Sequence, residues 1–236
     1  MRTLQGAIRL MVCGACLTAV QPALAAEIQS GFYLGVGGGQ SSYDIEKAEL
    51  DGAVFAGMAS AGAIVTSFGS TYEDSDTALQ LFAGYQFNPY IGVEAGYIDL
   101  GAAQLRSSGT MNPPGPVFSA PFAMNIDIES TGFTLAGLGR LPLGSVVDLH
   151  GRLGLLFAQT DVSVSSPSTR GSASETLDSI SGFFAVGAGV TLGQHWSLSV
   201  DWTRYDNVGD EDEDDDVTTE AGFNVDALSF SATFRF

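Results

Sequence analysis

The chain has 236 residues, 45% of them hydrophobic and 15% charged, and its 27 acidic against 9 basic residues give a formal net charge of −18. This acidic excess excludes a nucleic-acid partner, because phosphate backbones are bound through clustered lysine and arginine side chains. The two cysteines, Cys13 and Cys16, lie in an N-terminal segment that we expect to be removed, so a disulfide framework is excluded as well.

The N-terminal segment has the layout of a secretory signal peptide. Arg2 and Arg9 lie in a basic front region. An apolar stretch follows over residues 10–20, and it is too short to span a bilayer as a helix. Small residues then mark a cleavage site after Ala25 or Ala26, so residues 1–26 are predicted to be the signal peptide. A lipoprotein site at Cys16 is disfavoured, because Cys13 stands where such a site normally has leucine or a similar aliphatic residue.

Alternation of side chains dominates the rest of the chain. In seven segments apolar residues recur at every second position with small or polar residues between them, as Phe230 and Phe234 do against Ser229 and Ser231. An eighth segment, residues 130–143, is also predicted to be a strand, but both of its faces are apolar and its facing is ambiguous. The seven alternating segments are residues 31–39, 78–87, 90–100, 147–160, 179–193, 195–205 and 227–236.

The face opposite the apolar one is mostly glycine, alanine and serine. Small side chains suit the crowded interior of a narrow barrel, whereas a soluble sandwich would carry larger polar residues on its wet face. Aromatic residues near the strand ends are Phe32, Tyr85, Phe87, Tyr90, Trp196, Tyr205, Phe234 and Phe236. Aromatic residues at these places are typical of the interfacial girdles of membrane barrels.

Short and long connections alternate along the chain. Residues 88–89, 143–145 and 193–194 form short turns, while the long connections are residues 41–77, 103–125, 162–178 and 206–222. This asymmetry is typical of outer-membrane barrels, whose periplasmic turns are short. Because an open sheet edge is not tolerated in hydrocarbon, the last strand must pair with the first. Residues 27–236 are therefore predicted to form an all-β, eight-stranded antiparallel up-and-down transmembrane β-barrel with four long extracellular loops.

Five charged or titratable residues face the barrel interior by their parity in the alternation: Glu94, His150, Arg152, Asp201 and Arg235. An inward position avoids the cost of roughly 2–4 kcal/mol for an arginine or lysine facing lipid at the midplane. We interpret this set as a polar network that fills the core. A gated pore is the alternative.

An acidic run is the sharpest local feature outside the strands. It comprises Asp210, Glu211, Asp212, Glu213, Asp214, Asp215 and Asp216. Clustered carboxylates suit divalent cations, which could link this loop to a phosphorylated outer leaflet. The run lacks the pattern of an EF-hand, however, and runs of like charge are usually solvated, so the solvated interpretation is favoured.

The first long loop contains an apolar stretch over residues 52–70 that is unusual for an exposed connection. Two interpretations are open. The stretch extends the first hairpin beyond the membrane as strands that pack on each other, or it forms an apolar contact surface. Extended strands are favoured.

Three stretches carry a resemblance to a known family. "LFAGYQFNPYIGVEAGYIDLG" at residues 81–101 resembles the second and third strands of the OmpA transmembrane-domain family. "HGRLGLLF" at residues 150–157 is similar to the fifth strand, and "ALSFSATFRF" at residues 227–236 to the last. The resemblance covers residues 31–236 without the loops, and it implies a small barrel in the outer membrane of a Gram-negative bacterium.

The resemblance also implies roles for particular residues. Glu94 and Arg152 match an inward acid and an inward arginine of the family, while Gly137, Gly189 and Ser197 stand where the family can have charged partners. The terminal aromatics Phe234 and Phe236 resemble the signal that hands such barrels to their assembly machinery. Family members often carry a peptidoglycan-binding domain after the barrel, and since this chain stops at the barrel, we expect no such anchoring role.

The expected function is non-enzymatic: envelope integrity combined with surface contact through the loops. The expected partners are outer-membrane lipids, lipopolysaccharide and the barrel-assembly machinery, and no cofactor is expected. A narrow diffusion pore and an adhesin or host-factor binder remain alternatives. A lipid-modifying enzyme is least favoured, because both histidines, His150 and His195, lie near periplasmic turns, away from the outer leaflet.

Overall fold

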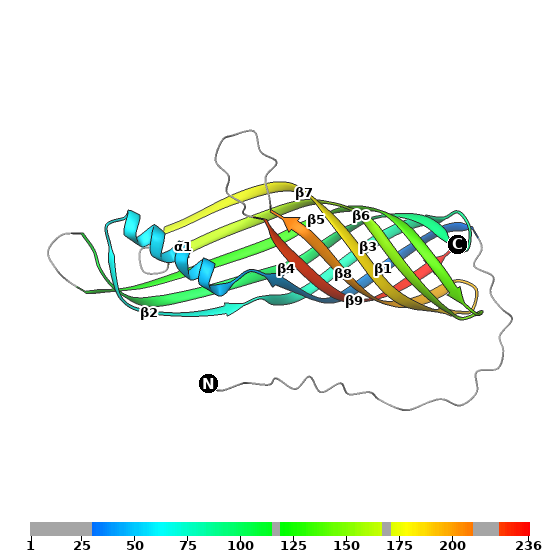
Figure 1. The fold of residues 1–236 in the computed structure, drawn as a ribbon, viewed down its shortest axis with the longest axis horizontal. Coiled ribbons are helices and arrows are strands. Elements are labelled where there is room, and N and C mark those ends of the chain that lie inside the picture. Colours follow the sequence, from blue (N-terminus) through cyan, green and yellow to red (C-terminus); the bar gives the residue numbers. More distant parts are fainter. Residues whose placement is uncertain (1–29, 115–118, 167–170, 210–221) are drawn as a thin grey trace, which may run out of the picture.

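A computed structural model describes residues 30–114, 119–166, 171–209 and 222–236 (Figure 1). The predicted signal peptide and the acidic run at residues 210–216 lie outside these ranges. Within them, no helix has the length and apolar character needed to cross a bilayer.

The described residues form one helix and nine strands, in the order β1 Gly31–Asp44, α1 Lys47–Ser60, β2 Ile64–Glu73, β3 Ser75–Gln86, β4 Ile91–Asn112, β5 Ala120–Leu143, β6 Val147–Ser166, β7 Gly171–Leu192, β8 Trp196–Val208 and β9 Phe223–Arg235. All described pairings are antiparallel. Strands β1 and β3–β9 form a closed ring of eight, and β2 pairs with the distal half of β4 outside that ring.

The ring is closed by the first and last strands. Strand β1 pairs with β9 from Tyr33 opposite Arg235 to Asp44 opposite Asn224. Closure gives the backbone N–H and C=O groups of both strands internal partners, as hydrocarbon requires. The predicted eight-stranded up-and-down barrel is confirmed.

Large apolar side chains cover the outside of the barrel, and small or polar side chains fill its inside. Phe133 and Leu153 are 65% and 74% exposed, whereas Ala136 and Leu138 are buried in the lumen. The register of β5 with β6 resolves the facing of residues 130–143, with Phe133 opposite Phe157 on the outer wall. Gly137, which was assigned to a possible inward charge position, faces outward instead.

The eight strands fall into two length classes. Strands β1, β3, β8 and β9 have 14, 12, 13 and 13 residues, whereas β4–β7 have 22, 24, 20 and 22. A membrane-spanning strand needs about 9–11 residues. Strands β4–β7 therefore continue well past their neighbours, by at least about 20 Å at roughly 3.3 Å per residue. Figure 1 shows this part as the left half of the molecule.

This result corrects the expectation of long loops at residues 103–125 and 162–178. Most of these residues are strand, and residues 115–118 and 167–170 lie outside the described ranges. The reason is visible in β5, where buried Ile126 and Ile128 alternate with Asp127 and Glu129. We call the distal part, comprising α1, β2 and residues 102–112, 120–129, 161–166 and 171–178, the extension.

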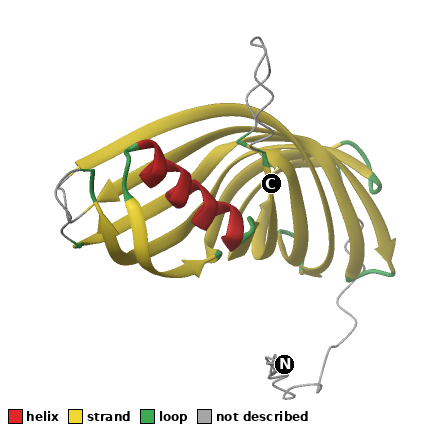
Figure 2. Ribbon diagram, turned by 60° about the vertical axis from the view of Figure 1, so that its left-hand side comes forward, coloured by secondary structure: helices red, strands yellow, loops and turns green. Residues whose placement is uncertain are grey.

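The expectation for the first long loop was half right. Strand β2 is an extended strand beyond the ring, but it pairs with β4 and not with β1, and residues 47–60 form helix α1. The alanine-rich sequence of this segment favours a helix, and Val54 and Met58, one turn apart, are both buried. Figure 2 shows α1 lying across one side of the extension. Strands β1 and β8 end at Asp44 and Val208, and β9 begins at Phe223, so these strands do not continue beside β4–β7 in this part.

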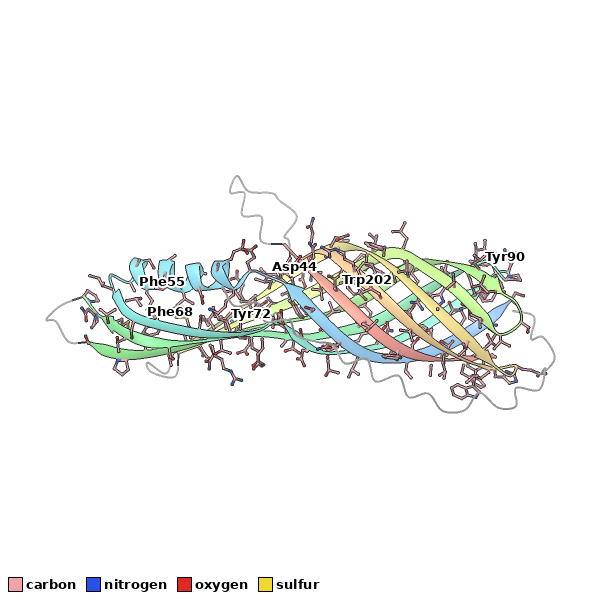
Figure 3. The ribbon with its side chains drawn as sticks, turned by 60° about the horizontal axis from the view of Figure 1, so that its bottom comes forward. Asp44, Phe55, Phe68, Tyr72, Tyr90 and Trp202 are labelled. Carbon is pink, nitrogen blue, oxygen red and sulfur yellow. The ribbon has the colours of Figure 1, made fainter. Side chains whose placement is uncertain are left out.

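The extension has a hydrophobic core of its own. Buried Leu105 and Phe122 line the inner face of the sheet and form a cluster with Val54 and Met58 of α1. Phe68 of β2 packs between helix and sheet, with its ring centroid 4.6 Å from that of Phe55 and 6.4 Å from that of Phe122. Figure 3 shows Phe55, Phe68 and Tyr72 together in the extension, and Tyr90 at the opposite end of the barrel.

Candidate functional site

The lumen of the barrel contains a chain of ionic contacts centred on Arg152. The guanidinium Nε lies 2.5 Å from Glu94 Oε2 on β4, and Nη1 donates a hydrogen bond of 2.8 Å to Asp201 Oδ1 on β8. Arg152 therefore joins two carboxylates that project from strands on different sides of the lumen. Such pairing compensates part of the large cost of removing these charges from water.

His150 continues the chain from Asp201. Its Nε2 lies 2.6 Å from Asp201 Oδ1, and its Nδ1 lies 3.0 Å from Asp148 Oδ1. Because carboxylates only accept hydrogen bonds, a ring with protons on both nitrogens satisfies both contacts at once. His150 is thus a bridge between two acidic groups.

The two ends of the chain are Arg140 and Tyr33. Arg140 Nε lies 3.5 Å from Asp148 Oδ1, and Tyr33 Oη donates a hydrogen bond of 2.8 Å to Glu94 Oε1. We call this chain the lumen network; its members are Arg140, Asp148, His150, Asp201, Arg152, Glu94 and Tyr33. Basic and acidic groups alternate along it from Arg140 to Glu94, which leaves little net charge inside the barrel.

Four of the five residues assigned to the interior by parity meet in this network: Glu94, His150, Arg152 and Asp201. The fifth, Arg235, is partly buried, and no ion pair joins it to another side chain of the described residues. Sequence reasoning missed Tyr33, Arg140 and Asp148. Asp148 has the parity of His150 and could have been found, whereas Arg140 lies on the strand whose facing was ambiguous.

Little free space remains beside the network. A cavity of about 30 Å³ adjoins Arg152 and Glu94, enough for roughly one water molecule. The guanidinium of Arg152 also lies 5.7 Å from the ring centroid of Phe82. The lumen at this level is occupied by side chains.

A second group of charges lies at the rim where the short strands end. Arg204 contacts Asp206 and Asp226 at 3.2 and 3.1 Å, and lies 3.8 Å from Asp44. The acidic run that was a candidate for divalent cations follows Gly209 and lies outside the described residues. Elsewhere, over the ranges that the structure describes, no group of three or more histidine, cysteine, aspartate or glutamate residues could hold a metal ion.

The terminal aromatics lie at the opposite end of the barrel. Phe234 packs edge-on against Trp196 with ring centroids 5.1 Å apart, and Phe236 is 71% exposed. The backbone N–H of Phe236 donates to the carbonyl of Phe32 at 3.1 Å. The last residue is therefore held beside the first strand, with its ring on the outside.

An apolar outer wall, a closed backbone ladder and a network of charged groups inside the lumen define a transmembrane β-barrel. The model of the OmpA-like transmembrane domain matches residues 28–236, and the chain belongs to this family. It is an outer-membrane β-barrel protein of the kind found in Gram-negative bacteria.

Two curated relatives are named Outer membrane protein A. The protein from Yersinia pseudotuberculosis is 27% identical over 175 residues, which cover 74% of this chain and 44% of that protein. The protein from Serratia marcescens is 27% identical over 168 residues, which cover 71% of this chain and 41% of that protein. The chain thus spans less than half the length of these relatives.

Solved structures of small barrels are also similar. The attachment invasion locus protein Ail of Yersinia pestis, in complex with the heparin analogue sucrose octasulfate, is 14% identical with a TM-score of 0.46, over 89% of this chain and 100% of that chain. Neisserial surface protein A is 14% identical with a TM-score of 0.47, over 88% of this chain and 98% of that chain.

Proposed function

We propose that this protein is a non-enzymatic surface scaffold: its barrel is anchored in the outer membrane and contributes to envelope integrity, and its extension contacts partners outside the cell. The observation that carries this proposal is the length of β4–β7, together with the buried core of Leu105, Phe122, Val54 and Met58 that the extension encloses. A packed core holds a contact surface in one shape, which lowers the entropic cost of binding.

The lumen network supports a structural role in preference to a pore. Its alternating ion pairs cross the barrel from Arg140 to Glu94, and the adjoining cavity holds about one water molecule. Barrels of eight strands are just wide enough for side chains to fill. A narrow diffusion pore would require these contacts to open.

The positions of both histidines support a non-enzymatic role. His150 is engaged by two carboxylates inside the barrel, and His195 stacks on Phe234 at the end opposite the extension. Hydrolysis or acyl transfer in the outer leaflet would need a base at the other rim. This placement supports a protein that binds and does not convert.

The biogenesis of the protein follows from the same proposal. We propose that residues 1–26 are a signal peptide, that Phe234 and Phe236 are read by the barrel-assembly machinery, and that lipopolysaccharide surrounds the barrel. Replacing Phe236 by serine should lower the amount of folded protein in the outer membrane, whereas refolding of the same variant in detergent should proceed normally. Unchanged amounts in cells would contradict the role of Phe236.

A variant without the extension tests the proposed surface contact. Residues 46–73, 104–127 and 162–175 are each replaced by a short glycine-containing turn, which joins strands at positions already paired, such as Ala103 opposite Ile128. Cells with either protein are applied to surfaces coated with polylysine, a neutral protein or heparin. We expect the intact protein to increase adhesion, most strongly to polylysine because Glu49, Glu73 and Glu175 lie exposed on the replaced segments. The shortened barrel should abolish this increase.

The barrel itself is the control in that experiment. Both proteins should show heat-dependent mobility on a gel, which reports a closed barrel, and both should protect cells against detergent equally. Equal adhesion by the intact and shortened proteins would overturn the surface-contact role. Stepwise conductance of the intact protein in a planar bilayer would favour the pore.

A further inference from the structure

A groove crosses the outer wall of the barrel at the level where the extension begins. Its volume is about 540 Å³, within the range of small-molecule sites. Its walls come from two adjacent cross-strand rows on β4–β7. The apolar row is Tyr97, Phe133, Phe157 and Ile180, and the polar row is Thr131, Gln159 and Asp178.

The apolar row marks the upper border of the lipid-facing wall. Phe157 and Ile180 are 44% and 57% exposed. The next pair on the same outer face, one row closer to the middle of the membrane, is Leu135 opposite Leu155. In the opposite direction, above the polar row, Glu129 faces Asp161 across the strands. The groove therefore lies where hydrocarbon gives way to lipid headgroups.

The polar row offers hydrogen-bond acceptors that have no side-chain partner among the described residues. Asp178, Gln159 and Thr131 make no side-chain hydrogen bond or ion pair with any residue in the described parts of the chain. No basic residue lines the groove. A carboxylate beside an amide and a hydroxyl, with further acids above, attracts a cationic donor and repels a bare phosphate.

We propose that this groove is a binding site for an outer-leaflet lipid whose headgroup carries a primary ammonium group. An acyl chain lies along Phe133 and Phe157, and the ammonium donates to Asp178, with Gln159 and Thr131 as further acceptors. The apolar row of the groove contacts the acyl chain, and the negative charge of Asp178 accounts for the preference for an ammonium headgroup. This site is separate from the lumen network and from the surface contact of the extension. The proposal of a lipid site therefore does not depend on either of them.

Lipid retention by the purified barrel tests the proposal. The full chain in detergent is mixed with equal amounts of dioleoyl phosphatidylethanolamine and dioleoyl phosphatidylglycerol, which share acyl chains and differ in the ammonium group. Native mass spectrometry then measures which lipid remains bound. We expect the wild type to retain the ethanolamine lipid roughly twofold to fivefold better, as one exposed ion pair allows.

Three variants separate the parts of the site. Asp178→Asn should abolish the preference between the two lipids, while Phe133→Ala should lower retention of both. Asp127→Asn is the matched control, because it removes the same charge from β5 outside the groove, and it should behave as the wild type does. Heat-dependent gel mobility shows that each variant is folded. Equal retention of both lipids by the wild type, or a preference that survives in Asp178→Asn, would overturn the proposal.

Discussion

Nε of Arg152 on β6 lies 2.5 Å from Oε2 of Glu94 on β4, although β5 separates the two strands. The contact therefore runs through the lumen and not along the wall. Since Arg152 also binds Asp201 on β8, a single side chain ties together three strands of the ring. Stability of the barrel should depend on it more than on any surface charge.

Replacing Arg152 by methionine should destabilise the barrel by about 3–5 kcal/mol, because it leaves Glu94 and Asp201 as buried charges without their partner. Urea unfolding in lipid vesicles, followed by tryptophan fluorescence, measures the change. The matched control is Arg106→Met, an exposed arginine in the extension whose described side-chain contact is with Gln104. That change should stay within about 0.5 kcal/mol.

A second variant separates charge from packing in the same site. Glu94→Gln in the Arg152→Met background removes one of the two buried charges that the loss of Arg152 leaves without a partner. The double variant should therefore recover part of the lost stability. If the double variant were as unstable as the sum of the two single changes, the ion pair would carry no coupling energy and the interpretation of the network would be wrong.

Closure of the ring depends on the close approach of β1 and β9 at Gly39. A Cβ atom there would overlap the carbonyl oxygen of Leu228 and lie 2.6 Å from Cα of Ser229. Gly39→Val should therefore prevent or greatly slow barrel closure, seen as loss of the heat-dependent gel shift after refolding. Gly137→Val on β5 is the control, because a Cβ at that position lies 3.9 Å from its nearest neighbour, the Leu153 carbonyl oxygen.

Helix α1 should come away from the extension without unfolding the barrel. Met58→Ala removes a buried side chain from the small core, at a cost of about 2 kcal/mol or more. We expect faster cleavage by protease within residues 47–60, with unchanged heat-dependent mobility of the barrel. Ala56→Ser, on the exposed side of α1, should leave the cleavage rate as it is. Loss of barrel mobility in Met58→Ala would show that the two parts fold as one unit.

Parity in the alternation was enough to predict the membrane part of the fold. It placed Glu94, His150, Arg152 and Asp201 on the lumen side. When the apolar face of a strand is turned to lipid, the residues between must face the lumen, because successive side chains point to opposite faces. It failed for Arg140, since residues 130–143 are apolar on both faces. There the facing is set by pairing with β6, which is a property of the tertiary structure.

The extension could not be predicted in the same way. Apolar and polar residues also alternate in its strands, but there the polar face is turned to water and the apolar face to a small core. This pattern differs both from that of the lipid-facing strands and from that of a loop. The bulge between Asp99 and Ala102, where Gly101 has a φ of 70°, further interrupts the alternation on β4. Helix α1 is buried only because it packs on the open side of the sheet. That packing is a tertiary contact, and the local sequence pattern does not predict it.

The extension should loosen at alkaline pH because of Tyr72. Burial, aided by the nearby carboxylates of Asp74 and Asp44, raises the pKa of Tyr72 to about 12, against about 10 for an unfolded tyrosine. The folded extension therefore holds a proton that the unfolded chain releases, so its stability falls as the pH rises from about 10 to about 12. Protease cleavage within residues 47–73 should accelerate over this window. Tyr72→Phe should remove much of the acceleration, whereas Tyr90→Phe, at the far end of the barrel, should not change it; an unaltered profile in Tyr72→Phe would assign the effect to another group.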